Sequence, residues 1–395
     1  MGNPSGMITT EQAFSILENA VSALNEIEVS LWDARNCVLA ETIVSPISMP
    51  PFRQSNMDGY AVSLHDSLEY HHVGEVKAGD EELISLKPGE AVKIFTGAAV
   101  PDSAQAVIQI EKVSIFEKQL LLDGPLLPNT NVRPMGSQIS KNDIALIKGT
   151  FLNPAGIGFL AGLGITSVNV IRKPSIGIVI TGNELVSPGQ PLPHGKVYES
   201  NAIMLHSALE KLDFDSVLLY EVRDDFESTK SILQKAIDEN DVVLVSGGIS
   251  VGDYDFTAKA LEDFGVKTLF CKVNQKPGKP LFAGKHGNKI IFALPGNPAA
   301  ALTCFYVYGL PTLQKLSGME VNYGTTVQKV LSHDFRVSNV RAQFLKAVVM
   351  DDSVTILPHQ DSSMLDSFAL ANALVYMPDG NYQKTKGDYV ALYLI

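Results

Sequence analysis

DVVLVSGG at residues 241–248 and IIFALPGNP at residues 290–298 each begin with an apolar run and end abruptly in glycine or proline. Such runs are typical of strands that are buried on both faces of a parallel sheet. Open α/β sheets bind their ligands at the carboxyl ends of the strands, where Gly-rich turns leave backbone N–H groups free. Lys276 and Lys279 stand between the two runs, on either side of Pro277-Gly278. The stretch therefore predicts a pocket for an anionic ligand that carries phosphate.

The composition is that of a long, acidic, globular protein. Of the 395 residues, 45% are hydrophobic and 19% are charged, and this length suggests about two to four domains. The net charge of −12 gives no support to nucleic-acid binding. No apolar run reaches membrane-spanning length, no signal segment is present, and the 3 cysteines lack metal-ligand spacing. We therefore expect a cytoplasmic protein with neither a membrane nor a nucleic-acid partner.

The first part of the chain predicts two helices and a β-rich insertion. Residues 9–25 carry apolar side chains at helical spacing behind a Thr9–Gln12 capping box. Asn153-Pro154 has the pattern of an N-cap followed by the first helical residue. Residues 73–123 consist of short apolar runs broken by turns, which predicts a small all-β domain between the two helices.

The second part predicts an α/β domain followed by a β domain. Residues 174–310 alternate strand and helix patterns, so we expect a three-layer doubly wound sheet. After about residue 321 the helical signal disappears, which indicates a small β-barrel. The expected parts are a discontinuous, elongated N-terminal domain with helical segments (1–45 and 128–172), a β domain inserted in it (46–127), the α/β domain (173–318) and the C-terminal β-barrel domain (319–395).

Polar loops follow the strands of the predicted α/β domain and should converge on one sheet edge. These loops are residues 182–184, 223–225, 246–255 and 295–298. Their backbone N–H groups can form an anion nest, at Ser246, Gly247, Gly248 and Ser250. The same loops carry carboxylates: Glu184, Asp224, Asp253 and Asp255. Carboxylates beside a phosphate repel it unless a cation bridges them, and Mg²⁺ prefers such oxygen ligands.

Each of these features has a simpler interpretation when it is taken alone. A Gly-Gly loop can be only a tight turn, and Asp224-Asp225 can be a solvated helix start. Asp58-Gly59 is either a turn or a functional carboxylate, and Thr96 by itself is a turn former. The convergence of the loops favours a Mg²⁺-assisted reaction on a phosphate or nucleotide. The pattern GxxxxGK[ST] is absent and no GxGxxG follows a strand.

The chain resembles the molybdopterin molybdenumtransferases, the MoeA family, which includes the gephyrin E domain. The resemblance runs from about Thr9 to Ile395 and depends on a combination of strings: PPF…NMDGYAV, IFTGAAVP, TGNELV, SGGISVGDYD, KPGKP and LPGNP. It implies insertion of molybdate into adenylylated molybdopterin, release of AMP, and a requirement for a divalent cation such as Mg²⁺. It also implies an elongated homodimer of four-domain subunits, with a molybdopterin-binding, MogA-like α/β domain.

The resemblance also implies roles for individual residues. Asp58 and Thr96 would face the α/β pocket of the partner subunit. The catalytic residues would be Asp58, Thr96, Glu184, Asp224 and Asp253, of which Glu184, Asp224 and Asp253 would hold the metal. The nucleotide and phosphate would lie against Ser246, Gly247, Gly248, Ser250, Asp253 and Asp255. The molybdate side would be formed by Lys276, Lys279, Arg341 and Ser363, and the loop wall by Pro295 and Pro298.

The chain departs from the common family pattern at a few positions. The departures are Gln138 and Asn183 where acidic residues are frequent, Gln275 where an apolar residue is usual, and Ala299-Ala300 where many relatives have a serine. We interpret them as variation within an active enzyme. The alternatives are a non-catalytic pterin-binding or scaffold protein, and a nucleotide hydrolase or nucleotidyltransferase of the related α/β fold. Expected protein partners are a MogA-like adenylyltransferase and molybdoenzyme chaperones.

Overall fold

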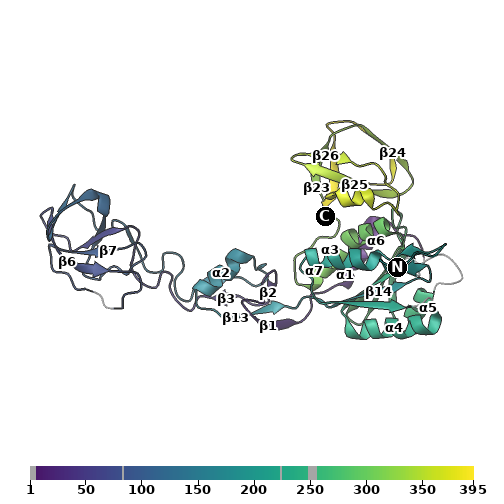
Figure 1. Ribbon diagram of the computed structural model, residues 1–395, viewed down its shortest axis with the longest axis horizontal. Helices are drawn as coiled ribbons and strands as arrows, with labels where there is room; N and C mark the ends of the chain where they lie inside the picture. Colours follow the sequence, from purple (N-terminus) through teal and green to yellow (C-terminus); the bar gives the residue numbers. More distant parts are fainter. Residues whose placement is uncertain (1–5, 82–83, 223–224, 248–255) are drawn as a thin grey trace. The chain divides into compact units, whose positions relative to one another are not determined.

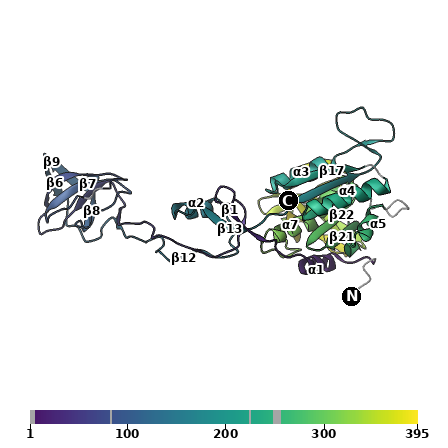
Figure 2. The same cartoon turned by 90° about the horizontal axis from the view of Figure 1, so that it is seen from below.

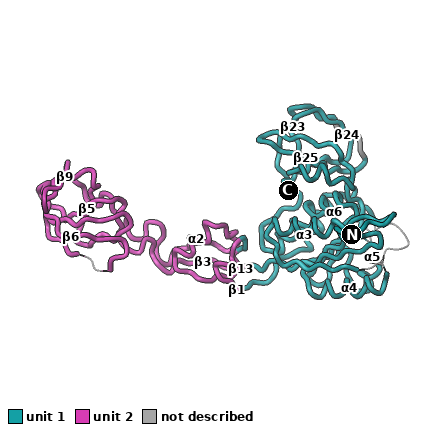
Figure 3. Tube along the Cα trace, in the orientation of Figure 1, with its two compact units in different colours: residues 1–27, 36–38, 171–395 teal, residues 28–35, 39–170 magenta. Residues whose placement is uncertain are grey.

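The structure, a computed structural model, describes residues 6–81, 84–222, 225–247 and 256–395. The chain divides into two compact units (Figure 3). Unit 1 contains residues 1–27, 36–38 and 171–395, and unit 2 contains residues 28–35 and 39–170. Unit 1 is therefore assembled from both ends of the chain, and unit 2 is inserted between them.

A six-stranded sheet forms the centre of unit 1. Its spatial order is β17 (Val217–Val222), β14 (Ile176–Thr181), β18 (Val242–Ser246), β22 (Lys289–Leu294), β21 (Pro280–His286) and β19 (Lys267–Lys272). The first four strands are parallel to one another, whereas β21 pairs antiparallel with β22 beside it (Figure 2) and with β19. The predicted α/β sheet is confirmed, with β21 as a strand that the sequence patterns did not indicate.

Helices cover both faces of this sheet, so it forms the middle of three layers (Figure 1). Ile178 of β14 packs into the core on one face, and its neighbour Val179 packs into the core on the other. The first core includes α1 (Thr10–Ala20), α3 (Asn201–Lys211), α6 (Pro298–Cys304), the π-helical segment η2 (Phe305–Gly309) and α7 (Leu310–Leu316). The second core includes α4 (Phe226–Glu239) and α5 (Phe256–Asp263).

Both predicted helix starts are present. Before α1, the Thr9 side chain accepts a hydrogen bond from the backbone N–H of Gln12, and the Gln12 side chain accepts one from the N–H of Thr9. In unit 2, Asn153 caps α2 (Pro154–Gly162) by accepting from the N–H of Gly156. Side-chain acceptors at these positions satisfy N–H groups that have no partner inside the helix.

A closed five-stranded β-barrel forms the C-terminal part of unit 1, as predicted. Its strands run β25 (Ala342–Met350), β26 (Ser353–Ile356), β23 (Val327–Leu331), β29 (Tyr389–Leu394) and β27 (Ala373–Met377), and β27 pairs again with β25. Beside the barrel lie β24 (Phe335–Asn339), β28 (Gly380–Lys384) and the short helix α8 (Asp366–Leu370). Apolar side chains such as Leu345, Val354 and Leu392 fill the barrel.

Unit 2 is mostly β-structure. Its largest sheet has the order β8 (Ala106–Gln109), β5 (Gly59–Val62), β7 (Glu90–Ile94), β6 (Glu69–Val76), β10 (Gln119–Leu122) and β9 (Val113–Phe116), with a 3₁₀ turn at Ile110–Lys112. Short pairings join β4 (Gln54–Ser55) to β11 (Val132–Arg133) and β3 (Ile43–Val44) to β12 (Ile144–Leu146). Most residues of a three-stranded sheet also belong to unit 2; its strands are β1 (Glu26–Ser30), β13 (Ser167–Ile171) and β2 (Val38–Leu39). In its described residues α2 is the sole α-helix, so helix is sparse here.

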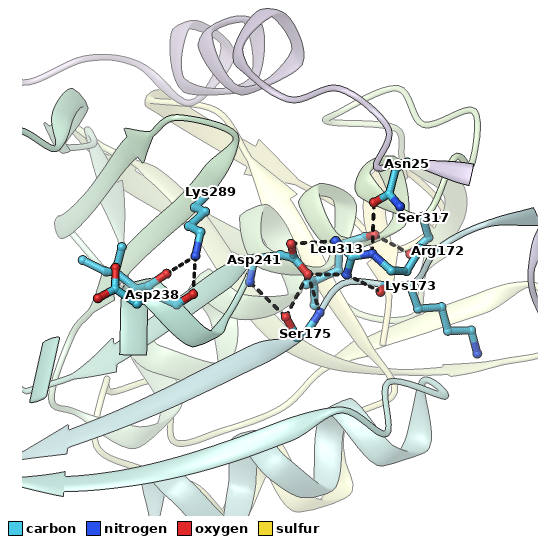
Figure 4. Close-up of polar contacts among 10 residues, drawn as sticks. Asn25, Arg172, Lys173, Ser175, Asp238, Asp241, Lys289, Leu313 and Ser317 are labelled. Atoms are coloured by element: carbon cyan, nitrogen blue, oxygen red, sulfur yellow. Dashed lines mark hydrogen bonds and ion pairs between the residues drawn. The ribbon is translucent and has the colours of Figure 1, made fainter. Parts of the chain in front are cut away.

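The starts of β14 and β18 are held together by one carboxylate (Figure 4). Asp241 accepts two hydrogen bonds from the guanidinium of Arg172, at 2.6 and 2.9 Å. It also accepts from the backbone N–H and the hydroxyl of Ser175, each at 2.8 Å. Burial raises the pKa of Asp241, but the hydrogen bonds from Arg172 and Ser175 outweigh it and lower the pKa from 3.8 to about 2. These bonds stabilise the edge of the sheet at which β14 and β18 begin, shortly after the chain returns to unit 1 at residue 171.

Asp241→Asn should lower the free energy of unfolding by about 2 kcal/mol, because it leaves the Arg172 guanidinium without its anion. The folded-state pKa lies below the ordinary value, so the stabilisation is complete above about pH 4 and is lost as the pH falls toward 2. Urea unfolding followed by circular dichroism between pH 2 and 7 measures both effects. Asp352→Asn is the control, since Asp352 pairs with Lys329 but is 97% exposed, so its loss should change the stability far less than the loss of Asp241. Equal losses for the two variants would contradict the account.

Candidate functional site

The carboxyl ends of the parallel strands meet on one edge of the sheet in unit 1. The pairing register places Ile180 beside Ser246 and Ser246 beside Leu294. The segments that follow β14, β18 and β22 therefore leave the sheet as neighbours, as the sequence predicted. This is the edge at which open α/β sheets bind ligands.

A cavity of about 600 Å³ lies at this edge. Six of the predicted site residues line it: Glu184, Ser246, Gly247, Pro295, Pro298 and Ser363. Its other lining residues are Ile180, Thr181, Leu185, Val197, Tyr198, Glu199, Ser200, Asn201, Pro280, Gly296 and Asn297. The structure therefore brings the turn after β14, the end of β18, the Pro-rich loop after β22 and a residue of the C-terminal barrel region to one hollow. A second cavity of about 420 Å³ adjoins it, because both include Ile180, Leu185 and Glu199.

Gly247 turns the chain sharply at the end of β18. Its φ of +93° lies in the left-handed region that disfavours side chains. A Cβ atom at this position would lie 2.3 Å from the carbonyl oxygen of Thr181. The close approach of two backbone segments requires glycine here and leaves the cavity wall formed by backbone.

Asn201, the first residue of α3, connects two of the loops. Its Nδ2 donates to the hydroxyl of Ser246 at 2.7 Å and to the carbonyl of Gly296 at 2.9 Å. Among the residues that the structure describes, its buried Oδ1 has no hydrogen-bond partner, and neither has the buried hydroxyl of Thr181, another residue of the cavity lining. Buried polar atoms normally have partners, so these two mark positions where a polar ligand would be favourable. Asn201 was not among the predicted site residues, because in the sequence it is only a polar residue before an apolar stretch.

Ser363 reaches the cavity on a loop of the C-terminal part. The adjacent Ser362 accepts hydrogen bonds from Asn297 Nδ2 at its hydroxyl (2.8 Å) and from the Ala300 N–H at its carbonyl (3.1 Å). Buried Lys346 of β25 holds the same loop by donating to the carbonyls of His359, Asp361 and Met364. Burial lowers the pKa of Lys346. These contacts connect the barrel to the loop after β22.

Two of the predicted cationic residues, Lys276 and Arg341, lie where β25 pairs with a short strand, and Lys279 follows in the same turn as Lys276. Strand β20 (Gln275–Lys276) pairs in parallel with β25, with Gln275 opposite Ala342 and Lys276 opposite Gln343. Arg341 immediately precedes Ala342, whose N–H donates to the carbonyl of Asn274. Lys276 and Lys279 are both exposed, and neither they nor Arg341 belong to the lining of the 600 Å³ cavity. The two lysines therefore stand outside this lining, although Pro280, which follows Lys279 directly, belongs to it.

Asp58 and Thr96 lie in unit 2 and contact each other directly. The antiparallel register of β5 and β7 pairs Gly59 with Ile94, which brings Asp58 and Thr96 to the same end of the sheet. Asp58 Oδ1 accepts from the backbone N–H of Thr96 at 2.7 Å and from its hydroxyl at 2.8 Å. These two bonds lower the pKa of Asp58, which keeps the carboxylate ionised.

Five predicted site residues lie outside the described residues: Asp224, Gly248, Ser250, Asp253 and Asp255. Of the three predicted metal ligands, this leaves Glu184 in the described part. Within that part, no group of three or more His, Cys, Asp or Glu side chains could hold a metal ion. Oxygen-bearing side chains of Glu199, Thr181 and Ser246 line the same cavity as Glu184, and oxygen donors suit Mg²⁺.

The departures from the family pattern have different surroundings. Gln138 is exposed in unit 2, and the backbone carbonyl of Asn183 accepts from Lys196. Ala300 is buried, and Ser362 of the barrel region packs against its backbone. Gln275 is fully buried.

Among the described residues, no helix is both long and apolar enough to cross a membrane.

Comparison with known proteins gives matches along nearly the whole chain. The family descriptions that match are "MoeA N-terminal region (domain I and II)" for residues 8–164, "Probable molybdopterin binding domain" for 177–315 and "MoeA C-terminal region (domain IV)" for 328–395. The chain is 30% identical to a molybdopterin molybdenumtransferase of Staphylococcus aureus over 98% of this chain and 95% of that protein. It is 38% identical to one of Haemophilus influenzae over 80% and 79% of the two chains. A crystal structure of the molybdopterin biosynthesis MoeA protein from Pyrococcus horikoshii matches with a TM-score of 0.82 and 29% identity, covering 99% of this chain and all of that one.

Thr96→Val should raise the pKa of Asp58, because it removes the hydroxyl that donates to the carboxylate while the backbone N–H remains. Titration of the Asp58 carboxyl carbon by NMR measures this change. Thr96→Ser, which retains the hydroxyl, is the control and should leave the pKa close to that of the unaltered chain. A Thr96→Val titration indistinguishable from that of Thr96→Ser would contradict the assignment of this hydrogen bond.

Proposed function

The chain belongs to the MoeA family of molybdopterin molybdenumtransferases, and on this premise we propose that it inserts molybdate into adenylylated molybdopterin and releases AMP, with Mg²⁺ as the metal. The chain is thus a transferase, and its substrates are small molecules. The observation that carries the proposal is the cavity at the carboxyl edge of the sheet, because it gathers six of the predicted site residues from four separate segments. Its volume of about 600 Å³ falls within the usual size of a small-molecule site.

The nucleotide half of the substrate fits the end of β18. Backbone groups around Ser246 and Gly247 face the cavity where the strand stops, and free N–H groups at such turns bind anions. The Thr181 hydroxyl could donate to a phosphate or a ribose oxygen, and Asn201 Oδ1 could accept from a ribose hydroxyl. Gly248, Ser250, Asp253 and Asp255, which follow in sequence, are proposed to complete this half.

Molybdate is proposed to bind at the cationic turn. Lys276 and Lys279 are exposed and Arg341 lies beside the same strand pair, so their positive charges can attract a divalent oxyanion. The protein as a whole carries a net charge of −12, so this attraction is local and should weaken with salt. Ser363 lies at the cavity on the barrel side and is proposed to bind the substrate between the two halves.

Mg²⁺ is proposed to be held by Glu184 together with Asp224 and Asp253. When bound, the metal would polarise the phosphoanhydride that joins AMP to molybdopterin. The chain's own residues would bind and orient the two substrates around it, and the dithiolene chemistry belongs to the ligand. The ionised Asp58, hydrogen-bonded to Thr96, is proposed to act from the partner subunit as a fixed negative charge.

Unit 2 supports the proposal of a homodimer. Large apolar side chains are exposed on it, and Ile144 and Val44 stand opposite each other in the β12–β3 pair with exposed fractions of 60% and 49%. Ile147 and Phe151, which follow along the chain, are exposed as well. Exposed apolar patches mark interaction surfaces, and we assign this one to a second copy of the chain. The four-domain division given above, a MogA-like adenylyltransferase partner and molybdoenzyme chaperones also remain proposals.

The decisive assay incubates the protein with adenylylated molybdopterin, molybdate and Mg²⁺ and measures AMP and molybdenum cofactor. We expect both products, in equal amounts, and Glu184→Gln should lower kcat by about 100-fold with a smaller effect on substrate binding. Glu262→Gln, at an exposed position of α5, is the control and should be unaffected.

Three outcomes would favour other functions. Substrate binding without AMP release would favour a pterin-binding scaffold. AMP release that is independent of molybdate would favour a nucleotide hydrolase, and transfer of the nucleotide to another acceptor would favour a nucleotidyltransferase. Any of them would contradict the proposed reaction.

Ile144→Glu should convert the proposed dimer into a monomer, because a charge buried in an apolar interface is costly. Size-exclusion chromatography with light scattering should show a fall from about 85 kDa, twice the 42.7 kDa of one chain, to about 43 kDa. Leu127→Glu is the control, since Leu127 is 75% exposed in the same unit but belongs to neither strand of this pair. A monomeric unaltered chain, or a dimer that tolerates Ile144→Glu, would refute the assignment.

A further inference from the structure

We propose that Gln275 is a positioning residue, which holds the turn of residues 276–279 in the shape that presents Lys276 and Lys279 to the oxyanion. The inference rests on the proposed molybdate site and adds to it a residue with no role in the family resemblance. The resemblance marks Gln275 only as a departure, since an apolar residue is usual at this position. The structure gives a physical reason for an amide here.

The Gln275 side chain is completely buried and its amide is bonded at both ends. Nε2 donates to the carbonyls of Pro277 and Gly278, at 3.1 and 3.2 Å, and lies 3.6 Å from the sulfur of Cys304. Oε1 accepts a hydrogen bond from the hydroxyl of Tyr308. Pro277 and Gly278 are themselves buried, so an apolar side chain at position 275 would deprive both carbonyls of this donor.

The turn packs directly onto this amide. Gly278 has a φ of +85°, and a Cβ atom there would lie 2.4 Å from Cys304 Sγ and 2.9 Å from Gln275 Nε2. On the other side, the N–H of Val273 donates to the carbonyl of Lys279 at 3.0 Å and closes the loop. The backbone between the two lysines is therefore fixed from both sides, while the lysine side chains remain exposed.

The groups around the amide stay neutral and are rigidly placed. Burial raises the pKa of the Tyr308 phenol and of the Cys304 thiol, so Tyr308 keeps the proton that it donates. The Tyr308 ring packs against Phe14 and Phe270, with centroids 5.3 and 6.4 Å away. Tyr308 belongs to the π-helical segment that follows α6. The core of the α/β part is thereby connected to the cationic turn through one hydrogen-bonded amide.

Gln275 also begins β20, the strand that pairs with β25 of the barrel. Its register opposite Ala342 places the turn next to Arg341. The same residue thus determines both the conformation of the lysine turn and its alignment with the third cation. A cluster of three cations on two segments binds a small oxyanion well only if their spacing is preorganised.

The test compares three variants of the full-length protein. Gln275→Leu removes the amide, and Gln275→Leu/Tyr308→Phe also removes the hydroxyl that would be left unpaired, which should recover part of the lost stability. Asn240→Leu is the matched control, because Asn240 is another buried amide bonded to a tyrosine hydroxyl, that of Tyr220, at the amino edge of the sheet. The measurements are thermal unfolding, hydrogen exchange of the peptide that covers residues 274–281, molybdate KM and kcat.

We expect both Gln275 variants to exchange faster in residues 274–281 and to raise the molybdate KM about tenfold, with kcat changed less than about twofold. Asn240→Leu should lose comparable stability but keep the KM and the exchange of the turn. An unchanged KM in both Gln275 variants, or an equal rise in Asn240→Leu, would overturn the proposal. If the unaltered protein shows no molybdate-dependent turnover, the proposed function fails, whereas the exchange data still decide whether Gln275 holds the turn.

Discussion

The parallel register of β14, β18 and β22 is the constraint on which the candidate site depends. Because Ile180, Ser246 and Leu294 stand side by side, the segments that follow them must leave the sheet at one edge. At the opposite edge, Asp241 bonds to Arg172 and Ser175 and fixes where β14 and β18 begin. A slip of one residue in either strand would turn the buried side chains to the wrong layer and move the loops that line the cavity.

Polar contacts between distant segments complete the site around that edge. Asn201 joins the end of β18 to the loop after β22, and Ser362 joins that loop to the barrel region. Gln275 joins the cationic turn to the core through its hydrogen bond from Tyr308, and to the barrel through the pairing of β20 with β25. Each contact is a neutral hydrogen bond, buried for Asn201 with Ser246 and for Gln275 with Tyr308 and exposed for Asn297 with Ser362, so it orients a segment without adding charge to the cavity. Charge is concentrated instead in exposed side chains, such as Lys276 and Lys279, that a ligand can reach.

The sequence was sufficient to predict the elements whose signals are local. The sequence shows the apolar runs of β14, β18 and β22, the capped starts of α1 and α2, and the change to a C-terminal barrel. Three of the predicted site residues, Glu184, Ser246 and Ser363, line one cavity. What could not be predicted depends on contacts between residues far apart in the chain. Asn201 meets Ser246 across 45 residues, and Asn297 meets Ser362 across 65. Strand β21 was missed because glycine, lysine and proline interrupt its apolar pattern, whereas pairing with β19 and β22 on both sides stabilises it.

If the chain has the proposed function, the nucleotide part of the substrate binds in the cavity at the carboxyl edge of the sheet. A crystal structure of the protein soaked with AMP, molybdate and Mg²⁺ would show where each of them binds. We expect the AMP phosphate against Ser246 and Gly247, and molybdate at Lys276, Lys279 and Arg341. Well-occupied AMP at any other surface, with this cavity filled only by solvent, would contradict it.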